Sequence, residues 1–157
     1  MNIFTIYLET TLFNFPFVDD APQYRADTEQ VWEAIRAGKF TPYTSTYTSQ
    51  ELEDTPDEIY RQKMLRLIPD FGVTVLQPTA AVDRLAGLYI TGAAIPVGFY
   101  TDALHIAITT VYRLDCIVSL NFRHIVREWT IKKVAEINAR EGYPAVGIYR
   151  PAEVLRL

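Results

Sequence analysis

Four polar side chains stand where apolar segments of this sequence begin or end. Glu9 directly follows the apolar run 2–8, and Asn121 follows the apolar run 116–120. Asp102 opens an apolar helical segment, and Glu51 lies in the first turn of another expected helix. A charge that ends a buried strand is costly unless it reaches water, is paired or binds a cation. A cation is thus one of three partners that would explain Glu9, whereas capping of a helix dipole is the simple interpretation of Glu51 and Asp102.

The composition restricts which metal such a site would bind. The chain has one cysteine, Cys116, and two histidines, His105 and His124. These are too few for a cysteine-rich or histidine-rich zinc site, and no internal disulfide is possible. Carboxylates must supply most of the ligands, which favours Mg²⁺ or Mn²⁺.

The segments that position these residues alternate between strand-like and helix-like patterns. Strands are expected over residues 2–8, 40–47, 73–76, 116–120 and 145–149. Helices are expected over 10–17, 21–37, 48–67 with Thr48 or Ser49 as the cap, 79–89, 102–114 with Thr101 as the cap, and 122–140, with a helical turn after Pro151. Residues 92–100 contain two glycines and a proline and predict a loop.

This alternation predicts an α/β fold with a mainly parallel central sheet and helices on both faces. The length of 157 residues is that of one domain, so residues 1–157 are expected to form a single unit. In such sheets ligands bind beyond the carboxyl ends of the strands. Glu9 and Asn121 would lie there, with Glu51 and Asp102 nearby.

Charge is distributed unevenly along the chain, whose net charge is −4. Residues 1–120 carry 8 basic and 15 acidic side chains, whereas residues 121–157 carry 7 and 4. The basic segment could place phosphates beside a carboxylate site; a solvated helix face is the simpler interpretation. No run reaches the roughly 18 apolar residues of a membrane span, and no signal peptide is evident, so we expect a cytoplasmic protein that does not enter the membrane.

Three segments together resemble the PIN domain, a family that includes the ribonuclease toxins of VapC-type toxin–antitoxin pairs. They are Ile6-Tyr-Leu-Glu-Thr-Thr11, Thr101-Asp-Ala-Leu-His-Ile-Ala107 and Ile117-Val-Ser-Leu-Asn-Phe-Arg-His-Ile125. The resemblance covers essentially the whole chain. It implies a three-layer α/β/α sandwich and a Mg²⁺- or Mn²⁺-dependent ribonuclease that leaves a 5′-phosphate and a 3′-hydroxyl. It also implies RNA as substrate, an antitoxin protein as a partner and a homodimer.

The resemblance also assigns roles to residues. Glu9, Glu51, Asp102 and Asn121 fall on the family's catalytic positions, with Glu9 and Asp102 as metal ligands. Asn121 would bind the metal through its carbonyl or hold a metal-bound water, and Glu51 would orient water or act as a further ligand. Glu9 and Asn121 depart from the aspartates usual at their positions. The longer arm of Glu9 and the missing charge of Asn121 would weaken a Mg²⁺ site, which demands near-ideal octahedral geometry.

Those departures keep two other functions open. One is a PIN-like module with an impaired site that binds RNA or protein, and the other is a phosphatase acting on small substrates.

Four further residues are candidates for substrate binding. Thr10 and Thr11 carry hydroxyls that could reach a phosphate or cap a helix, and Arg123 and His124 could hold a phosphate or form a charged surface. His105 lies three residues after Asp102, and we expect it to be a packing histidine. Asp115, Asp19 and Asp20 are expected in turns and loops, and Cys116 in the core.

Overall fold

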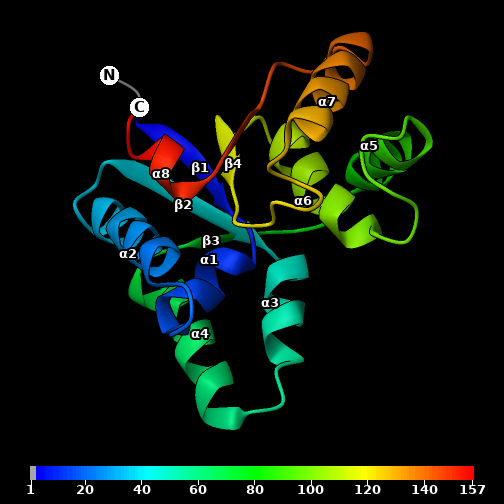
Figure 1. Ribbon diagram of the computed structural model, residues 1–157. Coiled ribbons are helices and arrows are strands. Elements are labelled where there is room, and N and C mark those ends of the chain that lie inside the picture. The colour runs from blue at the N-terminus through cyan, green and yellow to red at the C-terminus, as the bar shows by residue number, and fades with distance from the viewer. Residues whose placement is uncertain (1–2) are drawn as a thin grey trace.

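The computed structural model describes residues 3–157, and a five-stranded sheet forms its centre (Figure 1). The strands are β1 (Phe4–Leu8), β2 (Phe40–Ser45), β3 (Thr74–Leu76), β4 (Cys116–Val118) and β5 (Gly147–Tyr149). Their order across the sheet is β3-β2-β1-β4-β5, and every pair is parallel. This confirms the predicted α/β class with a parallel sheet. The predicted strand at 2–8 is observed from Phe4, and its first residue lies outside the described part of the chain.

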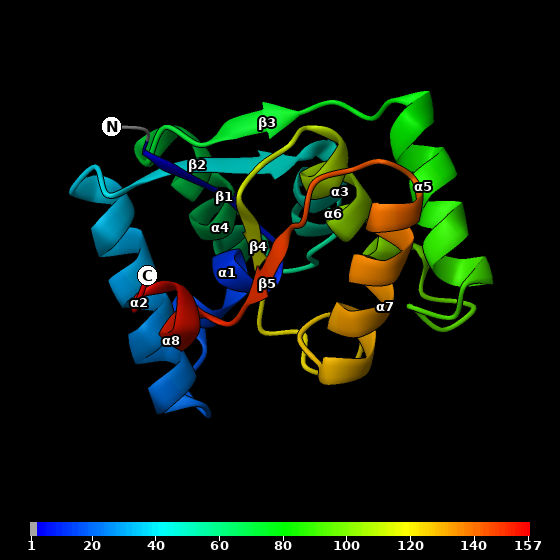
Figure 2. The same ribbon diagram turned by 90° about the horizontal axis from the view of Figure 1, so that it is seen from above.

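Helices connect the strands and cover both faces of the sheet (Figure 2). They are α1 (Thr11–Asn14), the 3-10 turn η1 (Phe15–Phe17), α2 (Pro22–Arg36), α3 (Thr46–Glu53), α4 (Glu58–Asp70), α5 (Ala80–Thr91), α6 (Tyr100–Val111), α7 (Glu128–Arg140) and α8 (Pro151–Val154). Helices α5, α6 and α7 lie on one face, and α1, α2, α4 and α8 lie on the other (Figures 1 and 2).

Alternation along β1 builds the two cores. Tyr7 faces the cluster of α5, α6 and α7, whereas Ile6 and Leu8 face the cluster that includes Phe13 and Trp32. Successive side chains of a strand point to opposite faces, so a strand covered on both sides is apolar throughout. Glu9, the next residue, falls at the carboxyl edge, as the sequence predicted.

Four of the differences between the predicted and the observed element boundaries bear on the site, and two of them lie around α3. The strand expected over 40–47 ends at Ser45, because the Ser45 hydroxyl accepts a hydrogen bond from Tyr47 N and begins α3 there. The helix expected over 48–67 is two helices. Pro56 disfavours helix before it, and Asp57 caps the second helix by accepting from Tyr60 N at 2.9 Å. Glu51 is therefore not in a first turn, which removes the capping interpretation for it.

The other two differences lie beside the predicted site. The helix with Asp102 begins at Tyr100 with Phe99 as its N-cap, so Thr101 is not its cap. The helix expected from Phe122 begins only at Glu128. Residues 121–127 form turns and bends instead, although the Asn121 side chain accepts a hydrogen bond from His124 N at 3.1 Å, as an N-cap side chain does.

Candidate active site

Glu9 is held at the junction of β1 and β4. Its side chain is only 4% exposed, and Oε1 accepts hydrogen bonds from Thr11 Oγ1 at 2.6 Å, Ser119 Oγ at 2.6 Å and Thr11 N at 3.3 Å. Hydrogen bonds to a charged acceptor are among the stronger ones in proteins. The extra methylene of Glu9 is therefore accommodated by a specific cradle, and the carboxylate is fixed in one position.

The residues of this cradle are themselves anchored on the next strand segment. Thr11 Oγ1 accepts from Leu120 N at 2.9 Å, and Ser119 Oγ accepts from Asn121 N at 2.9 Å. Thr11 thus positions Glu9 rather than capping α1, whose N-cap makes no side-chain bond. Ser119 is fully buried and was missed by the sequence analysis. Its only signal was its place at the carboxyl end of β4, two residues before Asn121.

Asp102 meets Asn121 and His124 across the edge of the sheet. Asp102 Oδ1 accepts from Asn121 Nδ2 at 3.1 Å, and Oδ2 is hydrogen-bonded to His124 Nδ1 at 2.9 Å. The Phe99 ring packs on the His124 ring at a centroid separation of 3.9 Å. The turn in place of the expected helix thus brings His124 to Asp102, which it contacts through Nδ1.

Glu51 belongs to a second hydrogen-bonded group. Its Oε1 accepts from Thr10 Oγ1 at 2.8 Å and pairs with His105 Nε2 at 2.8 Å. His105 Nδ1 is bonded to the Tyr7 hydroxyl at 2.6 Å, which also meets Ser45 Oγ at 2.7 Å. His105 is 1% exposed with both ring nitrogens bonded, in agreement with the packing role expected for it.

Electrostatics favours an ion pair between Glu51 and His105. Burial alone would lower the pKa of His105, but the Glu51 hydrogen bond and the charges of Glu9, Glu51 and Asp102 outweigh it and raise this pKa above its ordinary value. Burial would raise the pKa of Glu51, but the hydrogen bond and charge of His105 and the Thr10 hydroxyl lower it. Burial raises the pKa of Tyr7, so its hydroxyl keeps the proton.

The side chains of Glu9, Glu51, Asp102 and Asn121 line one cleft of about 320 Å³. Its lining comprises Glu9, Thr10, Thr11, Asn14, Glu51, Leu52, Thr55, Tyr60, Met64, Asp102 and Asn121. The structure thus brings all four predicted catalytic residues and both threonines to one place. Arg123 is exposed and makes no side-chain hydrogen bond or ion pair within residues 3–157, and neither it nor His124 is part of the lining.

The ligand chemistry of the cleft fits a hard divalent cation with few protein ligands. No group of three His, Cys, Asp or Glu side chains within residues 3–157 is arranged to hold a metal ion. Mg²⁺, however, is commonly held by one or two carboxylates and several waters. Glu9 Oε2 has no hydrogen bond to any residue of the described chain, and Asn121 Oδ1 has a second lone pair. Glu9 and Asp102, assisted by Asn121, could therefore serve as the protein ligands.

The remaining acidic candidates and Cys116 play structural roles. Asp115 accepts from Thr5 N at 2.7 Å and ties the start of β1 to the turn before β4. Asp19 forms an exposed ion pair with Arg25, and Asp20 is exposed. Cys116 is buried in β4, where burial raises the pKa of its thiol. These observations agree with the expected turn, loop and core positions.

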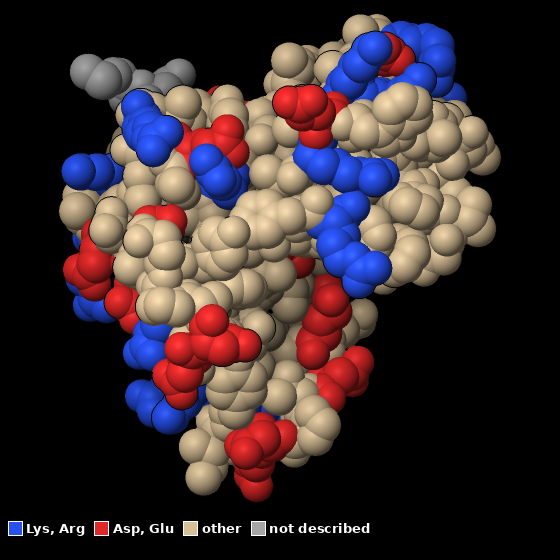
Figure 3. Space-filling view, in the orientation of Figure 1, with Lys and Arg blue, Asp and Glu red and all other residues tan. Residues whose placement is uncertain are grey.

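The surface around the cleft is divided by charge (Figure 3). Basic side chains gather over α7 and the segment before it, and acidic side chains over α3 and α4 below. Arg123 and Lys132 are exposed on the basic side, and Glu53 and Asp54 on the acidic side. A polyanion that approached the cleft would be attracted by the first side and repelled by the second.

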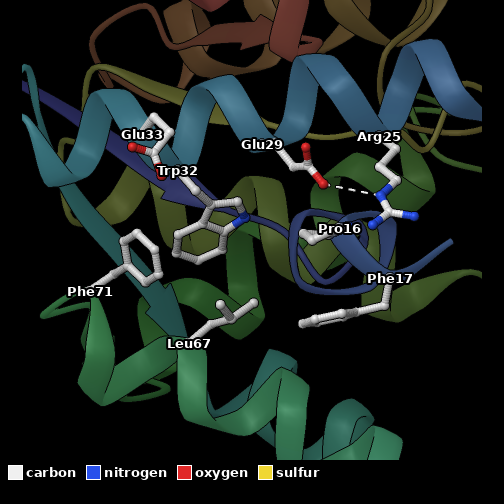
Figure 4. A pocket seen from close by; sticks show the side chains of 8 residues that line it. All are labelled: Pro16, Phe17, Arg25, Glu29, Trp32, Glu33, Leu67 and Phe71. Carbon is white, nitrogen blue, oxygen red and sulfur yellow. Dashed lines mark hydrogen bonds and ion pairs between the residues drawn. The ribbon is translucent and has the colours of Figure 1, made fainter.

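A second hollow, of about 410 Å³, lies between α2, η1 and the end of α4 (Figure 4). Trp32, Phe17 and Phe71 form its apolar wall, and the Arg25 guanidinium on its rim is paired with Glu29 at 3.0 Å. It shares no lining residue with the acidic cleft. Its two carboxylates, Glu29 and Glu33, are thus separate from those of the acidic cleft, and Glu29 is paired with Arg25.

Comparison with known proteins finds a likeness in fold alone. No family model matches the sequence, and no curated protein matches it. Among solved structures, a chain of the VapBC2 complex from Rickettsia felis, bound to a DNA fragment from its promoter, superposes with a TM-score of 0.55. The identity is 12%, over 74% of this chain and 88% of that chain. The PIN-like architecture expected from the sequence is thus matched in fold, at an identity too low to assign the family. Within residues 3–157, no helix is long and apolar enough to cross a membrane.

Proposed function

We propose that this chain is a metal-dependent endoribonuclease of the PIN type, with its active site in the acidic cleft. The single observation that carries the proposal is the convergence of Glu9, Glu51 and Asp102 on one cleft at the carboxyl edge of a parallel sheet. The similarity in fold to a VapBC chain supports the same reading.

The residues of the cleft would have the following roles. Glu9 and Asp102, with the Asn121 oxygen, would bind Mg²⁺ or Mn²⁺. When bound, such an ion polarises a phosphoryl oxygen and lowers the pKa of a water. Glu51, fixed by His105 and Thr10, would accept a hydrogen bond from the attacking water and orient it. The exposed Arg123 would attract the RNA backbone toward the cleft.

The test is cleavage of a mixed RNA pool in Mg²⁺, in Mn²⁺ or in EDTA. The wild type is compared with Asp102→Asn and with Asp70→Asn, which makes the same change at an exposed position outside the cleft. We expect metal-dependent cleavage by the wild type and by Asp70→Asn, and at least a roughly 100-fold loss in Asp102→Asn. Equal background in all three proteins would reject the proposal.

A binding module without catalysis is the second candidate, and one observation favours it. Glu9 Oε1 and both oxygens of Asp102 are already hydrogen-bonded to protein groups, and Asn121 contributes no charge. RNA binding that is unchanged by EDTA, with no cleavage in any metal, would support this function over the first.

An antitoxin is the protein partner that we propose, because the structural neighbour comes from a VapBC complex. A small DNA-binding protein encoded beside this chain would be the candidate. Co-expression of the two should yield a stable complex and suppress RNA cleavage. We also propose a homodimer, to be tested by sedimentation of the chain alone.

A further inference from the structure

The acidic cleft extends beyond the carboxylates to a group of neutral polar side chains that the proposed chemistry does not use. Asn14, Thr55 and Tyr60 line the same cleft as Glu9 and Asp102, and the buried Met64 adds an apolar surface. Asn14 follows Thr10 by four positions, so one turn of helix, about 6 Å, separates it from the threonine that holds Glu51.

Tyr60 fixes the orientation of the Asn14 amide. The Tyr60 hydroxyl donates to Asn14 Oδ1 and lies 3.2 Å from the Asn14 carbonyl oxygen. Its ring is packed edge-on against Phe17 at a centroid separation of 5.9 Å. Burial raises the pKa of Tyr60, so the hydroxyl keeps the proton that it donates. With the Oδ1 end occupied, the amide presents its Nδ2 end.

The Asn14 Nδ2 donor is unused by the protein. No acceptor within residues 3–157 is hydrogen-bonded to it, although the residue is half-buried in the cleft wall. Nδ2 is not sealed from solvent, so an acceptor on a ligand in the cleft can take the place of water at this donor. The cleft volume of about 320 Å³ lies near the lower end of ligand sites, which suits a single nucleotide rather than a longer segment.

We propose that Asn14, fixed by Tyr60, forms a base-binding subsite that selects the nucleotide next to the cleaved phosphate. The proposal rests on the ribonuclease function proposed above. Nδ2 donates hydrogen bonds only, so in a contact with the exocyclic group at C6 of a purine or C4 of a pyrimidine it favours guanine and uracil, which carry a carbonyl oxygen there. Adenine and cytosine carry an amino group at that position, which would meet another donor, so a contact with this exocyclic group disfavours both of them.

The first experiment measures binding, so that it does not depend on cleavage. In the Asp102→Asn background, fluorescent RNA tetramers that differ at one base are titrated without metal. Asn14→Asp replaces the free donor by an acceptor of the same shape. Gln62→Glu is the control, because it adds the same charge at an exposed position of α4. We expect a roughly 3- to 10-fold preference for guanine or uracil over adenine in the Asn14 protein and in the control.

In Asn14→Asp the ratio should invert toward adenine and cytosine, whose amino groups donate, even though the added charge weakens binding of every tetramer. Tyr60→Phe, which keeps the ring and frees the amide, should bring the ratio toward one. An unchanged ratio in both variants, with folding verified by thermal denaturation, would overturn the subsite.

Cleavage of the RNA pool, read by sequencing of the cut ends in the wild-type background, separates the two proposals. Cleavage whose base preference is the same in Asn14→Asp rejects the subsite and leaves the ribonuclease. Absence of cleavage together with base-selective binding rejects the ribonuclease and leaves the subsite as part of a binding module. Absence of both rejects the two together.

Discussion

The Nε2 atom of His105 lies 2.8 Å from Oε1 of Glu51, and the Nδ1 atom of the same ring lies 2.6 Å from the Tyr7 hydroxyl. The imidazole is thus fixed from both ends. It links a buried tyrosine of β1 to a carboxylate that is 42% exposed at the cleft. Helix α6 carries both Asp102 and His105. It therefore holds Asp102 directly, and it fixes Glu51 of α3 through the bond from His105.

This pair predicts a particular dependence of stability on pH. The pKa of His105 is raised in the folded protein. Its contribution to the free energy of unfolding is therefore complete below the ordinary pKa of 6.5 and is lost as the pH rises through the raised pKa. The pKa of Glu51 is lowered from 4.5, so its contribution is present above that value and is lost as the pH falls through the lowered one.

We therefore expect the melting temperature of the wild type to fall between about pH 6 and pH 9 more steeply than that of His105→Gln, which keeps a neutral donor. Thermal denaturation by circular dichroism across this range measures the two slopes. Parallel curves would show that the imidazole is neutral in the folded protein and that the pair makes no ionic contribution.

Ser119 provides a second prediction, on the cradle of Glu9. Ser119→Ala removes a 2.6 Å hydrogen bond to a buried carboxylate, without creating a large cavity. We expect the free energy of unfolding to fall by about 1.5–3 kcal/mol. Ser49→Ala is the control, because the Ser49 hydroxyl bonds only a carbonyl of its own helix, and it should cost less than about 0.5 kcal/mol. Urea denaturation compares them, and equal losses would refute the special role of Ser119.

The sequence predicted the framework of this site because its signals are local. An apolar run that ends in a charge places Glu9 at a strand end, and alternation of strands and helices places Asn121 at the same edge. Each strand or helix behind these two inferences is recognised from the hydrophobic pattern of a short stretch of sequence.

The rest of the site depends on contacts between distant parts of the chain. Ser45, Tyr7 and His105 come from β2, β1 and α6 and meet only because β1 and β2 are paired in one register. His124 reaches Asp102 because residues 122–127 form a turn in place of the expected helix. Neither outcome leaves a pattern in the sequence, since serine, tyrosine and histidine are also ordinary core and surface residues.

Asn121 provides a third prediction, which concerns metal affinity. Its Nδ2 donates to Asp102 Oδ1 at 3.1 Å, so Asn121→Asp would place two carboxylates in contact. In EDTA the repulsion should lower the free energy of unfolding by about 1–3 kcal/mol. A divalent cation would relieve it, so Mn²⁺ should bind roughly ten-fold more tightly than to the wild type. Calorimetric titration with Mn²⁺ measures this, and an unchanged affinity would place the metal away from Asp102.

Glu9→Asp gives the last prediction, because it introduces the residue that the resemblance to PIN domains leads us to expect at this position. The shorter side chain cannot keep Oε1 within reach of both Thr11 Oγ1 and Ser119 Oγ, each of which now lies at 2.6 Å. We expect a loss of about 1–3 kcal/mol in the free energy of unfolding and no gain in RNA cleavage, since the carboxylate would lose its fixed position. Asp102→Glu, which makes the reverse change at the other proposed ligand, serves as the comparison. Higher cleavage by Glu9→Asp at unchanged stability would mean that the cradle is incidental and that the length of this side chain limits catalysis.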